Sequence, residues 1–153
     1  MKGYGFNLVE FLLVAIILGI LAAIVVPQYS AASDETKVSN LINEMQNVRS
    51  QIQLYKNQHN GQLPTAGGLS FVDAMTKYTC ADGALSATQE PGPGVLGPYL
   101  EQIPKNPFIS EDSTASKVDC GEDMPTADGS SGWHFNIKTG AFSANDEITH
   151  SGL

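Results

Sequence analysis

The sequence predicts an α+β protein in which one long N-terminal helix packs on a small antiparallel β-sheet head. The prediction rests on an apolar run at Leu8–Val26, on apolar residues at helical spacing from Val38 to Tyr55, and on alternating apolar residues at Trp133–Ile137. The expected parts are a leading segment 1–5, a hydrophobic helix 6–32, an amphipathic helix half 33–60 and a globular head 61–153.

The apolar run Leu8–Val26 contains one charged residue, Glu10. As a helix it would be about 28 Å long, close to the roughly 30 Å of a bilayer's hydrocarbon core. Lys2 precedes the run and Asp34 and Glu35 follow it, so the positive-inside rule places the N-terminus in the cytoplasm. A carboxylate within a membrane helix is costly and needs a cationic partner, which makes Glu10 a candidate functional residue.

Two ordinary membrane-targeting interpretations compete for this segment. A secretory signal peptide cut after Ser30-Ala31-Ala32 would release a soluble Ser33–Leu153, and an uncleaved signal anchor would tether the head singly. Signal peptides usually have shorter apolar cores of about 7–15 residues. Neither interpretation explains Glu10.

The segment Gly5–Pro27, which reads GFNLVEFLLVAIILGILAAIVVP, resembles the class III signal of type IV pilins and type II secretion pseudopilins. The resemblance implies that a prepilin peptidase removes the leading segment as a leader peptide by cutting between Gly5 and Phe6. The new N-terminal Phe6 would then be N-methylated. One departure is Asn7, where the family usually has Thr.

The resemblance also assigns roles within the helix. Glu10 matches the family's glutamate, which is thought to meet the N-terminal amine of a neighbouring subunit and to set the axial register of assembly. Pro27 matches the helix-bending proline and, with Gly19, permits bending or local melting between them. Alternatively, small residues at these positions only permit close packing of neighbouring helices.

The second half of the predicted helix is amphipathic. Its apolar residues recur every three or four positions, and it is expected to end at Asn60-Gly61 before Pro64. A freestanding coiled coil is the alternative, but the repeat is too short to sustain one. The apolar stripe consists of Val38, Leu41, Ile42, Met45, Val48, Ile52 and Tyr55.

The head is expected to be loop-rich, with a short helix at 71–78 and a C-terminal hairpin. The hairpin pairs Trp133–Ile137 with Ala141–Ala144 around a turn at Lys138–Gly140. Gly97–Phe108 and this hairpin also resemble pilin-like heads, so the resemblance covers essentially the whole chain.

Two cysteines, Cys80 and Cys120, are expected to form a disulfide if the head is exported. In the chain-entropy model, closing such a loop stabilises the fold by roughly 4 kcal/mol. The alternative is a pair of buried free thiols. Neither cysteine has a second Cys or His at ligand spacing, so no metal site is predicted.

No cofactor is predicted, although calcium stays open. The acidic residues near the C-terminus do not match an EF-hand loop, and the calcium ligand pattern of related pseudopilins is not evident. The three histidines lie far apart and are expected to be exposed. The residues concerned are Asp119, Glu122, Asp123, Asp128, His59, His134 and His150.

The functional prediction is a structural subunit and not an enzyme, because no nucleophile, phosphate-binding or metalloprotease motif appears. A net charge of −8 without a Lys/Arg cluster argues against a dedicated nucleic-acid site. The resemblance implies a precursor in the inner membrane that becomes an extracellular type IV pilus filament. A major pseudopilin of a type II secretion system and a secreted soluble binding module are the alternatives. The implied partners are identical subunits, prepilin peptidase and the pilus or secretion assembly machinery.

Overall fold

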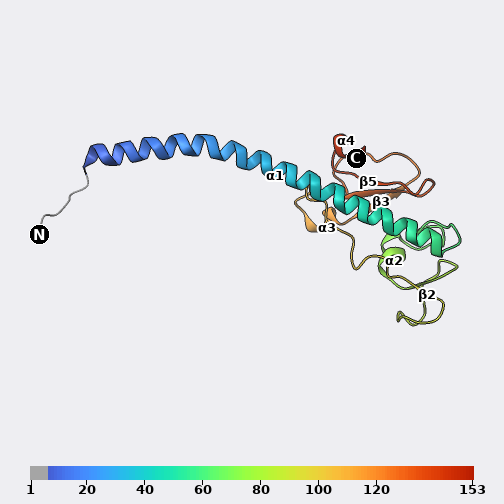
Figure 1. Cartoon of the computed structure of the whole chain (residues 1–153). Coiled ribbons are helices and arrows are strands. Elements are labelled where there is room, and N and C mark those ends of the chain that lie inside the picture. Colours follow the sequence, from blue (N-terminus) through green and yellow to red (C-terminus); the bar gives the residue numbers. More distant parts are fainter. Residues whose placement is uncertain (1–6) are drawn as a thin grey trace, which may run out of the picture. The chain divides into compact units, whose positions relative to one another are not determined.

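The computed structural model describes residues 7–153, apart from the side chains of residues 23–33. The chain divides into two compact units, Met1–Lys37 and Val38–Leu153. The elements in chain order (Figure 1) are α1 (Leu8–Gln58), α2 (Phe71–Thr76), β1 (Thr79–Cys80), β2 (Val95–Leu96), α3 (Asp112–Ala115), β3 (Val118–Gly121), β4 (Trp133–Asn136), β5 (Phe142–Ala144) and α4 (Ile148–Ser151).

Helix α1 begins and ends with clear backbone signals. Its first turn is closed by the amide of Phe11, which donates to the carbonyl of Asn7 at 3.1 Å. At the other end, Asn60 and Gly61 both have positive φ angles, 55° and 84°. The amide of Gly61 donates to the carbonyl of Lys56 at 2.8 Å, the longer-range bond of a Schellman motif. The predicted helix end at Asn60-Gly61 is therefore confirmed.

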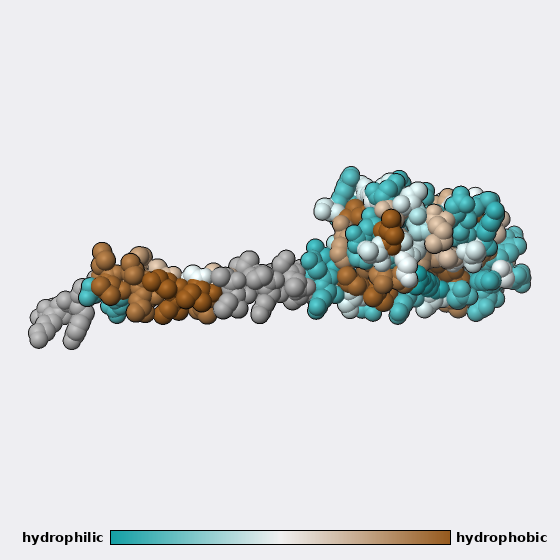
Figure 2. Space-filling view, turned by 90° about the horizontal axis from the view of Figure 1, so that it is seen from above, coloured by the Kyte–Doolittle hydropathy of each residue, from teal (hydrophilic) through white to brown (hydrophobic). Residues whose placement is uncertain are grey.

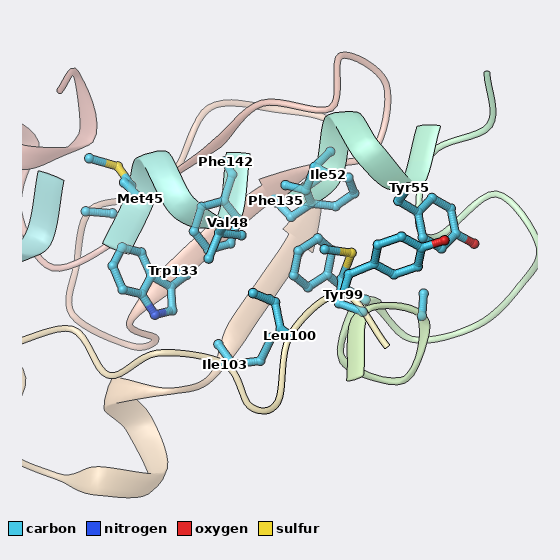
Figure 3. Close-up of a cluster of buried hydrophobic side chains, with 14 of the residues drawn as sticks. Met45, Val48, Ile52, Tyr55, Tyr99, Leu100, Ile103, Trp133, Phe135 and Phe142 are labelled. Carbon is cyan, nitrogen blue, oxygen red and sulfur yellow. The ribbon is translucent and has the colours of Figure 1, made fainter. Parts of the chain in front are cut away.

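The core of the Val38–Leu153 unit forms where α1 meets the sheet and the segment after β2 (Figure 3). The predicted stripe supplies Leu41, Met45 and Val48, each fully buried, followed by Ile52 and Tyr55. Side chains of α2, of the sheet and of the 99–103 segment complete the core, and several of their rings contact one another. Ring centroids lie 5.2 Å apart in the pair Trp133–Phe142 and 4.6 Å apart in the pair Phe71–Phe135.

The main sheet has three strands in the order β3-β4-β5 and is mixed. β4 and β5 pair antiparallel, with Trp133 opposite Ala144, which confirms the predicted hairpin. β3 runs parallel to β4, with Asp119 opposite His134, so the prediction of an antiparallel sheet is wrong for this strand. The reason is the connection 122–132, which returns the chain to the starting end of β3 instead of turning directly into a hairpin.

Gly132 marks the place where this connection enters β4. A Cβ atom at Gly132 would lie 1.9 Å from the carbonyl oxygen of Ala115, so only glycine fits there. The amide of Gly132 donates to Thr114 O at 2.8 Å, and its carbonyl accepts from the side chain of Asn106 at 3.0 Å. The close approach therefore fixes the start of β4 against the end of α3.

The remaining elements are short. Ser70 caps α2 by accepting the amide of Asp73 at 3.0 Å, and the helix confirms the one predicted near residues 71–78. β1 and β2 form a separate antiparallel pair, with Thr79 opposite Leu96. These two-residue strands were not predicted from the sequence.

Candidate functional site

The described part of the first unit is a helix whose apolar side chains are exposed (Figure 2). The large apolar side chains from Leu8 to Leu21 have exposed fractions from 43% at Val14 to 78% at Leu8. They surround the helix on all sides, because they do not follow the spacing of three or four that makes one stripe. Within the part of the chain that the structure describes, no helix combines the length and the apolar character that a membrane crossing requires.

Glu10 is an exposed side chain in the first turn of α1. A carboxylate at this position interacts favourably with the partial positive charge of the helix N-terminus. Gly5 and Phe6, the predicted cleavage and methylation positions, lie outside the described residues. The assembly role of Glu10 therefore stays a prediction.

α1 is continuous through Gly19 and Pro27, the two predicted positions of flexibility. A Cβ atom at Gly19 would meet nothing within 4 Å, so packing within this chain does not require a glycine there. The requirement, if any, comes from a neighbouring helix or from bending. The side chain of Pro27 lies outside those that the structure describes, and its role also stays a prediction.

Within the second unit, Arg49 of α1 binds β5 and the C-terminal residue, and the sequence analysis did not single this residue out. The Nε of Arg49 donates to the carbonyl of Phe142 at 2.8 Å, and Nη2 donates to the carbonyl of Leu153 at 2.9 Å. The available signal was weak, since the only hint is that Arg49 is the single arginine of the sequence.

The predicted disulfide is not formed in the structure, where Cys80 is a half-buried and Cys120 an exposed free cysteine. The two residues belong to different sheets, since Cys80 ends β1 and Cys120 lies in β3. Although Cys120 as a residue is exposed, its thiol is partly buried, and this burial, followed by the charge of Asp119, raises the pKa of the thiol. This environment favours the protonated thiol over the reactive thiolate.

The prediction that the histidines are exposed is wrong, because His59, His134 and His150 are 0%, 4% and 8% exposed. His59 stacks on Tyr55 with ring centroids 3.7 Å apart. Each ring lies against segments distant in the sequence, and no local pattern signals that burial. Among the described residues, no group of three or more His, Cys, Asp or Glu side chains is placed to hold a metal ion.

Two buried tyrosines close the end of the core near the end of α1. Tyr55 and Tyr99 lie edge to face with ring centroids 5.2 Å apart. The Tyr99 hydroxyl donates to Gln58 Oε1 at 2.7 Å. Burial, together with the neighbouring Tyr55, raises the pKa of Tyr99 to about 12. The His59 ring completes this cluster, because it stacks on Tyr55 and lies edge to face with Tyr99, with ring centroids 6.0 Å apart in the second pair.

Comparison with known proteins finds relatives that share one name. The chain is 30% identical over 104 residues to the type II secretion system core protein G of Pseudomonas aeruginosa, covering 68% of this chain and 67% of that protein. The chain belongs to the family of type IV pilins and type II secretion pseudopilins. The predicted family resemblance is thereby confirmed.

Two further relatives carry the same name. The core protein G of Dickeya chrysanthemi is 27% identical over 146 residues, covering 90% of this chain and 89% of the relative. That of Aeromonas hydrophila is 28% identical over 104 residues, covering 68% of this chain and 66% of the relative. The aligned part thus spans about two thirds of the Pseudomonas and Aeromonas proteins. No protein-family model matches the chain, and no solved structure matches it significantly.

Proposed function

We propose that the chain is a major pseudopilin, the repeating subunit of a type II secretion pseudopilus that assembles through its N-terminal helix. The observation that carries this proposal is the apolar surface of α1 at Leu8–Leu21, which the chain itself leaves exposed. Removing such a surface from water is favourable by about 25 cal/mol per Å², so the helix needs lipid around it before assembly and neighbouring helices around it in a filament. The Val38–Leu153 unit buries its own core and can form the outer part of each subunit.

The sequence analysis predicted a surface pilus and gave the pseudopilus as an alternative. The names of the relatives support the pseudopilus. In the proposed sequence of events, the precursor is held in the inner membrane with its N-terminus in the cytoplasm. Prepilin peptidase cuts after Gly5, and the secretion machinery adds the processed subunit to the growing filament. The role is structural, and adhesion at the cell surface is not part of it.

The first test is the intact mass and N-terminal sequence of the processed protein. We expect a chain that begins at N-methylated Phe6. Such a chain keeps the apolar segment Leu8–Leu21, which the proposed assembly requires. A chain that begins at Ser33 would overturn the proposal, since the apolar helix would then be discarded and a soluble binding module would remain.

The second test addresses assembly through Glu10. Glu10→Val is expected to lower the yield of cross-linked multimers by at least about tenfold, because the neighbour's N-terminal amine would lose its buried counter-charge. Asp34→Asn is the matched control: Asp34 is also a carboxylate of α1, and its side chain is 66% exposed. Equal multimer yields from the two variants would contradict the role of Glu10.

A deletion strain separates the pseudopilus from the pilus. Loss of the chain should abolish export of enzymes secreted across the outer membrane while leaving surface filaments in place. The opposite result, with loss of long surface filaments and normal export, would favour the type IV pilus.

A further inference from the structure

The end of α1 carries the one Asn-Gly sequence of the chain, at Asn60-Gly61. An asparagine side chain loses its nitrogen spontaneously when the backbone nitrogen of the next residue attacks its amide carbon. Glycine is the most permissive next residue, because no side chain shields its nitrogen. Both residues are exposed, and a Cβ atom at Gly61 would meet nothing within 4 Å. The sequence and the exposed position therefore leave Asn60 open to this reaction.

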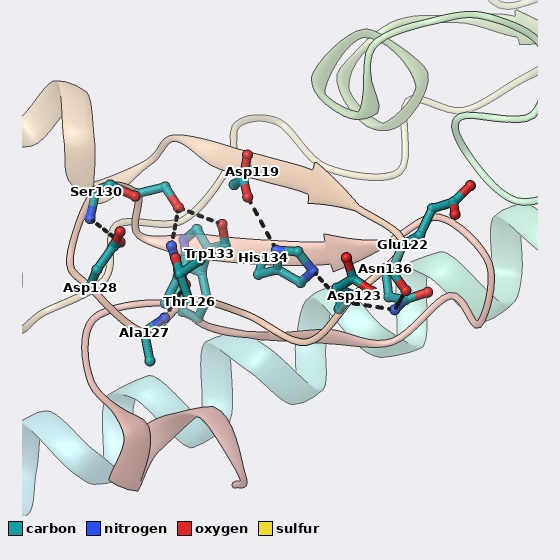
Figure 4. A network of polar contacts seen from close by, with 12 residues as sticks. Asp119, Glu122, Asp123, Thr126, Ala127, Asp128, Ser130, Trp133, His134 and Asn136 are labelled. Carbon is teal, nitrogen blue, oxygen red and sulfur yellow. Dashed lines mark hydrogen bonds and ion pairs between the residues drawn. The ribbon is translucent and has the colours of Figure 1, made fainter.

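Beyond α1, the three other asparagines are poor sites for the same reaction. Asn136 is buried, and its side-chain nitrogen, which would have to leave, donates to the carbonyl of Asp123 at 3.1 Å (Figure 4). Asn145 is fully buried, and its side-chain nitrogen donates to Ser131 Oγ at 2.8 Å. Asn106 is followed by a proline, which has no backbone N–H that could attack.

Asparagines within α1 are protected by the helix itself. In an α-helix, the amide of the following residue donates to the carbonyl four residues back, and this bond holds both its proton and its position. Asn57 is exposed like Asn60, but the next residue, Gln58, still belongs to α1. Asn57 is therefore an internal comparison that lies close to Asn60 in the same chain.

The backbone after α1 opposes the reaction at Asn60 as long as the last turn is closed. The amide of Gly61 donates its proton to the carbonyl of Lys56 at 2.8 Å, and the amide of Gln62 donates to the carbonyl of His59 at 3.0 Å. The attacking nitrogen has to give up its proton, so the first of these hydrogen bonds must break before the nitrogen can reach the side chain. The reaction therefore waits for the turn to open.

Two side chains beside Asn60 fix this turn to the core. Gln58 accepts the Tyr99 hydroxyl at 2.7 Å, and the buried His59 ring stacks on Tyr55. Because of these contacts, opening of the turn costs more free energy than fraying of an unattached helix end. The contacts thus set how often Asn60 reaches the reactive geometry.

We propose that Asn60 is a site of spontaneous deamidation that the folded end of α1 controls. When the turn opens, the Gly61 nitrogen loses its proton and bonds to the side-chain amide carbon of Asn60. The bond from that carbon to the side-chain nitrogen breaks, and the nitrogen leaves as ammonia, which takes up the proton. Water then opens the resulting cyclic imide at one of its two carbonyls, which leaves aspartate or isoaspartate in place of Asn60.

Either product changes the end of the helix. Both place a carboxylate at the C-terminal end of α1, where the partial negative charge of the helix dipole disfavours it. Isoaspartate also adds one carbon atom to the backbone, so the bond from Gly61 to Lys56 cannot re-form with the same geometry. Deamidation is therefore expected to keep the turn open once it has occurred.

The test uses the full chain in detergent, kept at mildly alkaline pH either folded or unfolded in guanidinium chloride. Peptide mass spectrometry measures the gain in mass when an amide nitrogen is replaced by oxygen, and fragmentation separates aspartate from isoaspartate. Asn60 should deamidate at least about tenfold faster in the unfolded chain than in the folded chain. In the unfolded chain it should also react faster than Asn57.

Tyr99→Phe tests the control by the helix end, because it removes the hydroxyl that binds Gln58. It should raise the rate at Asn60 in the folded chain. Tyr78→Phe is the matched control, since Tyr78 is held through its backbone by Gln89. Equal rates at Asn60 in the folded and unfolded wild type, equal rates for the two variants, or an equal rate at Asn57 in the unfolded chain would overturn the proposal. The proposal does not rest on the pseudopilin function.

Discussion

Helix α1 contains two apolar stretches with different surroundings. Between Leu8 and Leu21 the large apolar side chains are 43–78% exposed, whereas Leu41, Met45 and Val48 are fully buried. The second stretch repeats every three or four residues and makes one stripe that a single head can cover. The first stretch is apolar on all sides, so one neighbour cannot cover it. The comparison shows that the spacing of apolar residues, as well as their number, separates a surface for folding from a surface for assembly.

The test with the largest expected change in stability uses the same substitution at two places on α1. Leu41→Ala should lower the free energy of unfolding by about 2–5 kcal/mol, because it leaves a cavity in the core. Leu13→Ala, at a side chain that is 56% exposed, should change it by less than about 0.5 kcal/mol. Urea unfolding of the unassembled chain, followed by circular dichroism, measures both values.

The ranking should reverse when assembly is measured instead. Leu13→Ala should reduce the yield of multimers from correctly folded chains, because the lost surface would contact neighbouring subunits. If Leu13→Ala unfolds the head as readily as Leu41→Ala, the separation of the two stretches is wrong.

A second, smaller effect sharpens the comparison on the polar side of the buried stretch. Arg49→Met should lower the free energy of unfolding by about 1–3 kcal/mol, because the carbonyls of Phe142 and Leu153 lose charged donors. Arg49→Lys is the control, because it keeps the charge but cannot reach both carbonyls in the same way. Its free energy of unfolding should lie between those of the wild type and Arg49→Met. Denaturation of the three proteins in parallel measures the series, and a wild-type midpoint for Arg49→Met would show that the helix holds the sheet by apolar contact alone.

The smallest expected effect depends on pH and concerns Tyr99, whose ring contacts Tyr55 at the end of the buried stretch. The pKa of Tyr99 is raised to about 12 in the folded head, whereas an unfolded tyrosine titrates near 10. The folded state therefore binds this proton more tightly, and its contribution to stability is complete below about pH 10 and lost as the pH rises through about 12. Leu8–Leu21 contains no tyrosine, so alkaline pH should not act on it in this way.

Thermal unfolding of the wild type and of Tyr99→Phe between pH 9 and 12 measures this effect. The variant should lose less stability over that range, because the buried hydroxyl is absent. Parallel curves for the two proteins would assign the alkaline loss to another group.

The sequence predicted those elements whose pattern is local. The stripe on α1 follows from apolar spacing, its end from Asn60-Gly61, and the hairpin from alternating residues around a turn that ends at Gly140. The parallel partner of β4 was missed because nothing within Val118–Gly121 specifies the direction of pairing. Strands of two residues, such as β1, are too short to show a period at all.

The side-chain environments were harder to predict than the elements. Burial of His59 depends on Thr79, which is twenty residues away, and burial of His134 depends on the connection that contains Asp123. The cysteine pairing is hard to predict for a similar reason, since spacing along the chain does not determine which sheet holds each cysteine, and both thiols are free in the structure. The candidate assembly helix was found from sequence because its exposed apolar surface depends only on its own composition.

The close approach at Gly132 has a consequence for how freely this head can change over evolutionary time. Any side chain there would collide with the carbonyl of Ala115, and the same glycine accepts the Asn106 amide. In a library of single substitutions, folded variants should be frequent at exposed residues such as Met124, which is 79% exposed. Folded variants with a substitution at Gly132 should be absent. Variation of the head's surface is therefore expected in the loop that contains Met124, whereas Gly132 stays unchanged.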